Sequence, residues 1–398
     1  MSLDYQQVRQ QVRELGENAP IRERRLKEQR EQALQHLKEY SRKLEALREK
    51  VASARRFDPT LRCALPADDS LGRFEALDER FDLPELPKTA TILAADGSQI
   101  APDRHAEVLY GLINVGAIQM RLGSPGAPLI NVESKLIYDD ALFTPSDSLL
   151  SEDGLALLRD LKERQMLVEL ARAAQAPVIT FTDGPMELWG AKDAGDSADF
   201  KRSLDIYLDV LEALHRLGVS TAGYVEKPAA GLVVRLLEVA ITPADFLPNI
   251  KDHHPLRGVS DKFLYEKILE PNERSAVFAM QSKSAVNYKG ALGLYFFYLN
   301  VGRADHPHLA RVEIPAWVAV DPLKLDYLHA ALVSQCRIMG SRAYPYLLHR
   351  AHEAAVVKQE EKAQVTQMIA LELRSRGVEV DEISYKQSAK DLPSRTRY

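Results

Sequence analysis

Two aspartates occupy matching places in two strand-like segments of the sequence. Asp96 follows the apolar run TILAA, Asp183 follows VITFT, and each is followed directly by a glycine. Such a pair often only caps a turn, and its glycine lets the backbone turn sharply or approach a ligand closely. A carboxylate that ends an apolar strand is costly to bury without a cation or a donor. Two of them on neighbouring strands therefore predict a site for hard divalent cations.

A third carboxylate could come from the helix predicted over about Glu152–Ala174. The strand Ile179–Asp183 rises about 3.3 Å per residue, and the helix before it descends about 1.5 Å per residue. From the end of that helix, Glu163 lies roughly 16 Å up, near the level of Asp183, whereas Glu169 lies only about 7 Å up. Glu163 is therefore the predicted ligand and Glu169 the alternative, although either could be an ordinary solvated acid.

Two further charged residues belong to strand-like segments near these acids. Lys227, in GYVEKP, ends the strand that follows Asp183. There it could hold a phosphate or neutralise charge on a leaving oxygen, although a single lysine at a strand end is commonly just solvated. Glu133, in NVESK, is another strand acid that could face the site.

The late segment YPYLLHRAHE, Tyr344–Glu353, is the densest cluster of reactive side chains. If a helix begins here, His349 and His352 share one face, with Arg350 between them. Two histidines at this spacing are weak evidence for a metal site. One of them could be an acid–base group or a phosphate contact while the other packs, and Tyr344 could position a water or touch the substrate backbone.

Composition excludes several classes of protein. The chain has 398 residues, a net charge of -5 and only two, distant cysteines, Cys63 and Cys336. The charge gives no global sign of nucleic-acid binding, so a basic surface would have to be local. The cysteine usage argues against a disulfide framework or a zinc ribbon. With no signal core and no apolar run of about 18 residues, the protein is expected to be cytoplasmic, with no membrane partner.

The N-terminal part of the sequence has a helical pattern. No glycine occurs between Gly16 and Gly72, and apolar residues recur at spacings of four and three. They are Ala33, Leu37, Tyr40, Leu44, Leu47 and Val51. This stripe predicts a long helix that forms a solvated hairpin or short coiled coil. Because residues 21–56 hold twelve Lys and Arg against six Glu, the alternative is an arm that contacts DNA or a protein partner.

The remainder of the chain predicts a mixed α/β sheet flanked by helices. Three strands beginning near Thr91 follow one another without a helix, so they should pair antiparallel. Strands and helices then alternate. We further expect a late pair of strands, GLYFFYLNVG and ARVEIPAWVAV, and two closing helices over about Leu323–Met339 and Ala351–Arg376.

The segments that carry these residues resemble the NurA nuclease family. They are ADGS, TDGP, SDKFLYEKILEPNERSAVF, ARVEIPAWVA and YPYLLHRAHEAAVV, which occur in this order between about Thr91 and Gly377. The resemblance implies a ribonuclease H-like core. Its span indicates a nuclease domain over 86–380, and the sequence pattern predicts a helical, coiled-coil-like arm and connector over 1–85 and a basic flexible tail over 381–398.

The resemblance also implies roles for individual residues. The family's acids fall on Asp96, Asp183 and Glu163, with Glu169 as the alternative to Glu163; its late tyrosine and histidine fall on Tyr344 and His352, and its strand-end lysine falls on Lys227. The sequence departs from the family pattern at Pro185, where a serine is common, and in having a second histidine, His349, in the last motif. These departures leave the helix acid and the choice of histidine open.

The function that the resemblance implies is a DNA nuclease that uses one or two manganese or magnesium ions. Members of the family degrade DNA 5′-to-3′, cut single strands internally, form homodimers and act with a hexameric HerA-type ATPase in DNA-end resection. Two alternatives stay open. One is an inactive scaffold that tethers a translocase, and the other is an RNase H-like enzyme acting on RNA, because a fold does not by itself fix a function.

Overall fold

The computed structural model describes residues 3–67, 71–104, 106, 108–144, 148–188, 198–340 and 342–378. Contacts divide the chain into two compact units. Unit 1 comprises Met1–Glu85 and Gly223–Val333, and unit 2 comprises Leu86–Ala222 and Ser334–Tyr398. The tail predicted over 381–398 lies outside the described residues. Of the helices described, none combines the length and apolarity that a membrane span requires.

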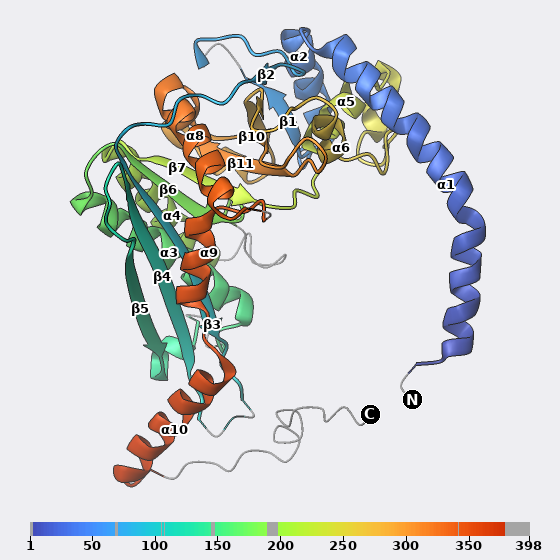
Figure 1. Ribbon diagram of the computed structural model, residues 1–398. Helices are drawn as coiled ribbons and strands as arrows, with labels where there is room; N and C mark the ends of the chain where they lie inside the picture. The colour runs from blue at the N-terminus through green and yellow to red at the C-terminus, as the bar shows by residue number, and fades with distance from the viewer. Residues whose placement is uncertain are drawn as a thin grey trace. The chain divides into compact units, whose positions relative to one another are not determined.

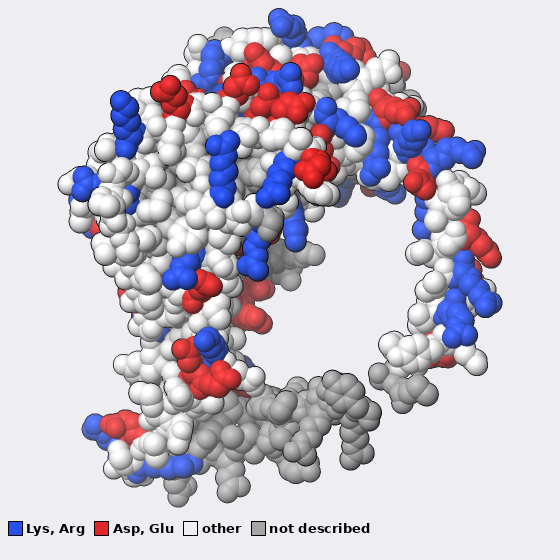
Figure 2. Space-filling view, viewed as in Figure 1, with Lys and Arg blue, Asp and Glu red and all other residues white. Residues whose placement is uncertain are grey.

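The long N-terminal helix that the stripe predicts is present, and a second, shorter helix follows it. They are α1 (Tyr5–Tyr40), which runs through Gly16 and Pro20, and α2 (Leu44–Arg55) (Figure 1). The break follows from Ser41, whose carbonyl accepts from the amide of Leu77 at 3.0 Å. The C-terminal end of α1 and all of α2 pack within unit 1, on α5 (Leu232–Ile241), α6 (Asp261–Glu266) and β1 (Cys63–Pro66). On the face shown in Figure 2, Lys and Arg alternate with acids along α1.

The strands of unit 1 pair antiparallel. β1 pairs with β9 (Phe278–Gln281), then come β10 (Leu294–Asn300) and β11 (Leu309–Pro315), and β11 pairs with residues 223–225 of β7 (Ser220–Val225). The predicted late pair is confirmed, since β10 and β11 pair along their full length. The remaining elements of unit 1 are β2 (Arg80–Phe81), β8 (Arg274–Ser275), α7 (Ala316–Ala319) and the larger part of α8 (Pro322–Ile338).

The segment SDKFLYEKILEPNERSAVF has a structural explanation in unit 1. Its Asp261 is fully buried and accepts hydrogen bonds from the amides of Val233 and Val234 at 2.8 and 2.7 Å. It thereby caps α5, whose own N-cap residue, Gly231, offers no side-chain acceptor. The hydroxyl of Tyr298 donates to the same carboxylate at 2.6 Å. A buried carboxylate with three donors at a helix N-terminus stabilises the fold.

Unit 2 contains the predicted mixed sheet. Its strand order is β7, β6 (Val178–Asp183), β3 (Ala90–Ile100), β4 (Gly111–Leu122) and β5 (Leu129–Ile137), where β7 contributes residues 220–222. The three successive strands β3, β4 and β5 pair antiparallel as expected, whereas β3 and β6 are parallel. The strand–helix alternation is also confirmed, with α3 (Glu152–Ala173) before β6 and α4 (Ala198–Arg216) after it.

Helices lie on both faces of this sheet, and two glycines mark the faces. A side chain on Gly97 would meet Arg159 and Glu163 of α3, whereas one on Gly116 would meet the backbone of α9 (Tyr346–Ala355). Gly116 pairs with Asp96, the neighbour of Gly97. Because neighbouring strand residues point to opposite faces, α3 and α9 cover opposite sides of β3 and β4.

The second closing helix differs from the prediction, which placed one helix over Ala351–Arg376. The structure has α9 and then α10 (Gln359–Ser375). The carbonyl of Ala355 accepts hydrogen bonds from the side chains of Ser98 and Asn114, and the amide of Val357 donates to the hydroxyl of Ser98 at 3.2 Å. Side chains of β3 and β4 thus replace the backbone bonds that would have continued α9.

Gly116 allows α9 to lie directly on β4. A β-carbon there would stand 2.8 Å from both the carbonyl oxygen of Ala351 and the amide nitrogen of Ala355. Those are backbone atoms and cannot rotate away, so any side chain at position 116 would push α9 off the sheet.

We therefore expect Gly116→Ala to lower the free energy of unfolding by about 1–3 kcal/mol, the usual cost of overpacking. Thermal and denaturant unfolding measure this. Gly126→Ala is the control, since a β-carbon there would have only the hydroxyl of Ser124 nearby, at 3.6 Å. Equal stabilities of the two variants would contradict the role given to Gly116.

Candidate functional site

Asp96 and Asp183 lie at the same level on neighbouring parallel strands. The register pairs Ala95 with Thr182, directly before the two acids, and adjacent strands are about 4.8 Å apart. β6 ends at Asp183, as predicted, and Gly184 turns the chain with a left-handed φ of 80°. The prediction that Asp96 also ends its strand is wrong.

β3 continues for four residues beyond Asp96, to Ile100. It does so because β4 pairs with it along its whole length, and Gly97 pairs with Val115 in extended conformation. Asp96 therefore stands where the parallel partner β6 leaves the sheet, not where its own strand stops. The glycine after it serves a close approach rather than a turn.

The segment around α9 contributes a partner for each aspartate. The hydroxyl of Tyr344, which precedes α9, donates to Oδ1 of Asp183 at 3.0 Å. Nδ1 of His352, on α9, lies 2.7 Å from Oδ2 of Asp96. Asp96 also accepts a hydrogen bond from the amide of Gly97 at 2.8 Å. Four of the residues named from the sequence thus form two polar pairs within unit 2.

The contact with Asp96 orients the ring of His352. Because Nδ1 faces the carboxylate, Nε2 on the opposite side of the ring is the nitrogen that can exchange a proton with a bound molecule. The histidine side chain is 60% exposed, whereas that of Asp96 is 17% exposed. The pair therefore opens to solvent on the histidine side.

His349 and Arg350, the other two candidates from the segment Tyr344–Glu353, contact a different acid. Nε2 of His349 lies 3.5 Å from Oε1 of Glu353, and Nη1 of Arg350 lies 2.7 Å from its Oε2. Of the two histidines, the structure brings His352 to a predicted site acid.

Glu163 is buried on α3, beneath the strand that carries Asp96. Its Oε1 would lie 2.8 Å from a β-carbon at position 97, so only a glycine there lets the carboxylate approach β3. Burial raises the pKa of Glu163 to about 8, with the charges of Asp160 and Asp96 adding to the rise and those of Arg164 and Arg159 opposing it. Glu169, the alternative, is exposed.

Arg159 belongs to this cluster and was not singled out from the sequence. Its Nε lies 3.2 Å from Oε1 of Glu163, and its Nη2 lies 2.8 Å from Oδ1 of Asp160. The neighbouring charges of Asp160, Glu163 and Asp96 raise its pKa against the effect of burial. Its position four residues before Glu163 could have indicated this contact from the sequence, because residues four apart on a helix are neighbours.

A second residue missed from the sequence holds the turn after Asp183. Arg164 is buried, and its Nη2 donates to the carbonyl of Pro185 at 3.2 Å. Its guanidinium lies 5.0 Å from the ring centroid of Tyr207, whose hydroxyl donates to the carbonyl of Met186 at 2.6 Å. Together α3 and α4 hold the turn, and no local pattern could have revealed contacts between residues this far apart in the chain.

Two other candidates are not brought to these acids by any described contact. Lys227 is exposed, follows the end of β7 and belongs to unit 1, so its role stays a prediction. Glu133 lies on β5, is half exposed, and has its Oε1 3.9 Å from Nζ of Lys162.

The donors suit a hard divalent cation in their chemistry. Across the described ranges, no three His, Cys, Asp or Glu side chains converge closely enough to hold an ion by themselves. Mg²⁺ and similar ions, however, usually bind through one or two carboxylates together with water and substrate phosphates. Asp96 and Asp183 at one level fit that requirement, and Glu163 approaches the same strand from the side of α3. Burial, and after it the negative charges of Asp160 and Asp96, raise the pKa of Glu163, and a cation beside the carboxylate would act in the opposite direction.

The family model of the NurA domain matches residues 90–357 of the chain. No curated protein sequence matches the chain significantly. Solved structures that resemble the chain include the NurA nuclease from Sulfolobus solfataricus, with 10% identity over 75% of this chain and 88% of that chain and a TM-score of 0.48. Another is NurA with manganese, with 11% identity over 74% of this chain and 92% of that chain and a TM-score of 0.38. The catalytic domain of human endonuclease V covers 82% of this chain and 98% of its own at 11% identity, with a TM-score of 0.34.

Replacing the buried carboxyl is expected to stabilise the metal-free protein. A folded-state pKa of about 8, above the unfolded value of about 4.3, means that Glu163 costs stability progressively as pH rises between these values. Glu163→Gln should therefore raise the free energy of unfolding by about 1–3 kcal/mol at pH 8 and by less at pH 6. Denaturant unfolding in EDTA at both pH values measures this.

Glu169→Gln is the matched control, because the same substitution on the exposed face of α3 should leave stability unchanged. A loss of stability in Glu163→Gln at both pH values would show that the carboxyl is a structural requirement rather than a cost of the site.

Proposed function

The chain belongs to the NurA domain family, a family of nucleases, and we propose that it cleaves DNA phosphodiester bonds with a divalent metal ion. The observation that carries this proposal is the pairing of Asp96 with His352 and of Asp183 with Tyr344 on neighbouring strands. A pair of carboxylates beside a histidine and a tyrosine suits hydrolysis of a phosphodiester, which needs a charged oxygen stabilised and a proton moved.

We assign the metal to the carboxylates Asp96, Asp183 and Glu163, with one or two Mn²⁺ or Mg²⁺ ions. When bound, such an ion polarises a phosphoryl oxygen and makes a water more acidic. Gly97 keeps the path between Glu163 and β3 open. Tyr344 holds the carboxylate of Asp183 in one orientation through its hydroxyl.

We assign the proton transfer to His352. Its Nδ1 lies against Asp96, so Nε2 accepts the proton of the attacking water or donates one to the departing oxygen. Arg159 supplies a fixed positive charge beside the carboxylates, which favours binding of the anionic backbone. Lys227 is proposed as a further phosphate contact, and Arg350 and His349 as contacts to the nucleic acid.

The biological setting follows from family membership alone. We infer degradation of DNA in the 5′-to-3′ direction, internal cutting of single strands, and action on DNA ends in resection and repair. The inferred partners are DNA, a hexameric HerA-type ATPase and a second copy of the chain, within the cytoplasm.

The central test is a cleavage assay on labelled single strands of DNA and of RNA with Mn²⁺ or Mg²⁺. We expect wild-type protein to degrade DNA, and Asp96→Ala to lower the rate by about 10²-fold or more, because removing one group that stabilises charge in the transition state commonly costs that much. Asp209→Ala, at an exposed aspartate of α4, controls for loss of a surface charge.

Full activity in Asp96→Ala, or no activity of wild type with either ion, would refute the assignment. Preference for the RNA strand would move the protein to the alternative class.

The two histidines give a separate prediction. His352→Gln should lower kcat by roughly 10²–10⁴-fold, the usual worth of a general acid or base, and flatten the dependence of kcat on pH. His349→Gln, at the neighbouring histidine that contacts Glu353, should keep the wild-type pH profile. Equal losses in the two variants would remove the distinction between them.

A further inference from the structure

A cleft in unit 2 lies beside the candidate site. It has a volume of about 1180 Å³ and runs between the end of β3, the residues leading into α3, and α10. Along β3, Gln99 lines the cleft three residues after Asp96, which corresponds to about 10 Å of strand. Along the C-terminal segment, Val357 lines it five residues after His352. The same two chain segments thus pass from the site into the cleft.

The cleft is more basic than the chain as a whole. Of the described residues that line it, four are cationic, Arg104, Lys358, Lys362 and Arg374, and two are acidic, Asp103 and Glu152. Four positive and two negative charges give a local charge of +2, whereas the whole chain carries -5. A local basic groove in an acidic protein is the electrostatic footprint of a bound polyanion.

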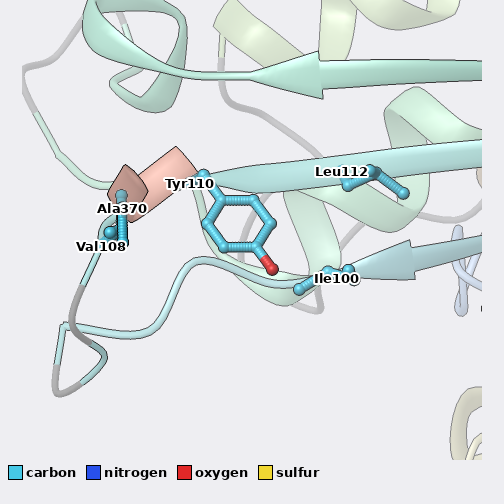
Figure 3. Close-up of a cluster of buried hydrophobic side chains, with 5 residues drawn as sticks. All are labelled: Ile100, Val108, Tyr110, Leu112 and Ala370. Atoms are coloured by element: carbon cyan, nitrogen blue, oxygen red, sulfur yellow. The ribbon is translucent and has the colours of Figure 1, made fainter. Parts of the chain in front are cut away.

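The helix that carries two of these cations is fixed to the sheet. Figure 3 shows a buried cluster that joins the end of β3 and the start of β4 to α10. Its members are Ile100, Val108, Tyr110, Leu112 and Ala370. The hydroxyl of Tyr110 also lies 2.9 Å from that of Thr366 and donates to the carbonyl of Lys362 at 3.3 Å. Because α10 is packed and hydrogen-bonded to the segment before β4, Lys362 belongs to a helix that is held in place beside the cleft.

The side chains that line the cleft indicate which part of a nucleic acid it would contact. Among the residues described, its lining includes no Phe, Tyr, Trp or His, the side chains on which bases stack. Its polar residues instead suit phosphate oxygens, which are contacted without regard to sequence. The volume is close to that of sites for small ligands, about 300–1,000 Å³, which accommodates a short stretch of one strand and not a duplex.

We propose that this cleft holds the sugar–phosphate backbone of a single DNA strand next to the bond that is cut, with Lys358 and Lys362 as phosphate contacts. The proposal rests on the proposed function, since it extends the same site. It makes the cleft a sequence-independent grip that keeps a strand in place between successive cuts.

Binding without cleavage tests the cleft separately from the chemistry. We would measure the affinity of a labelled oligothymidylate in EDTA over a range of KCl concentrations. Each phosphate contact contributes a slope of about -0.7 to log K against log salt for single strands. Lys358→Gln/Lys362→Gln should therefore make the slope shallower by about 1.4 and weaken binding at low salt about tenfold or more.

Two controls keep this result specific. Lys201→Gln/Arg202→Gln removes the same charge from the exposed face of α4 and should leave the slope as in wild type. Lys358→Arg/Lys362→Arg keeps the charge and should retain the wild-type slope, which an effect on folding alone would not predict. An unchanged slope in the Gln variant, or an equal change in the α4 control, would overturn the proposal.

The cleavage assay adds a second measurement. The Gln variant should raise KM for a long strand by a larger factor than KM for a minimal thymidine diester, which is too short to reach the cleft. An equal loss on both substrates would place the lysines in the chemistry and overturn the assignment of a separate grip. The binding measurement decides about the cleft even if no cleavage is found.

Discussion

The close docking of α9 on β3 and β4 is the constraint on which the site depends. Gly116 removes the side chain that would keep the helix away, and the carbonyl of Ala355 ties its end to the sheet through Ser98 and Asn114. Only with this helix in place does His352 reach Asp96. Gly116 has no side chain and lies on a strand without any of the predicted ligands, yet it allows the contact between Asp96 and His352.

Much of the sheet was accessible from the sequence because its signals are local. Apolar runs ending in polar residues marked the strands, and three strands without an intervening helix implied antiparallel pairing. The prediction also put Asp96 and Asp183 on neighbouring strands, which the parallel register bears out. The geometric choice between Glu163 and Glu169 used the rise of helix and strand, and the structure has Glu163 buried and Glu169 exposed.

The contacts that could not be predicted all join residues far apart in the chain. Helical periodicity continues from α9 into α10, so nothing local indicated that side chains of β3 and β4 would interrupt it after Ala355. The same holds for Arg164, which contacts the carbonyl of Pro185 in the turn after β6 and the ring of Tyr207 on α4. Gly97 was recognised as special, but the reason for it, the approach of Glu163 from α3, needed coordinates.

The buried carboxylate of Glu163 lowers the stability of the fold. Burying Glu163 near Asp96 and Asp160 raises its pKa because the folded protein must hold like charges together in a poorly solvated place. Arg159 offsets part of this cost, yet its guanidinium is a fixed cation that leaves the pKa of Glu163 well above the usual range. A hydrophobic side chain at that position would pack at lower cost, so stability alone does not account for the acid. In the proposed function a divalent cation would supply the missing charge, and the cost of assembling the carboxylates without it would become binding energy for the ion and for the phosphate it accompanies.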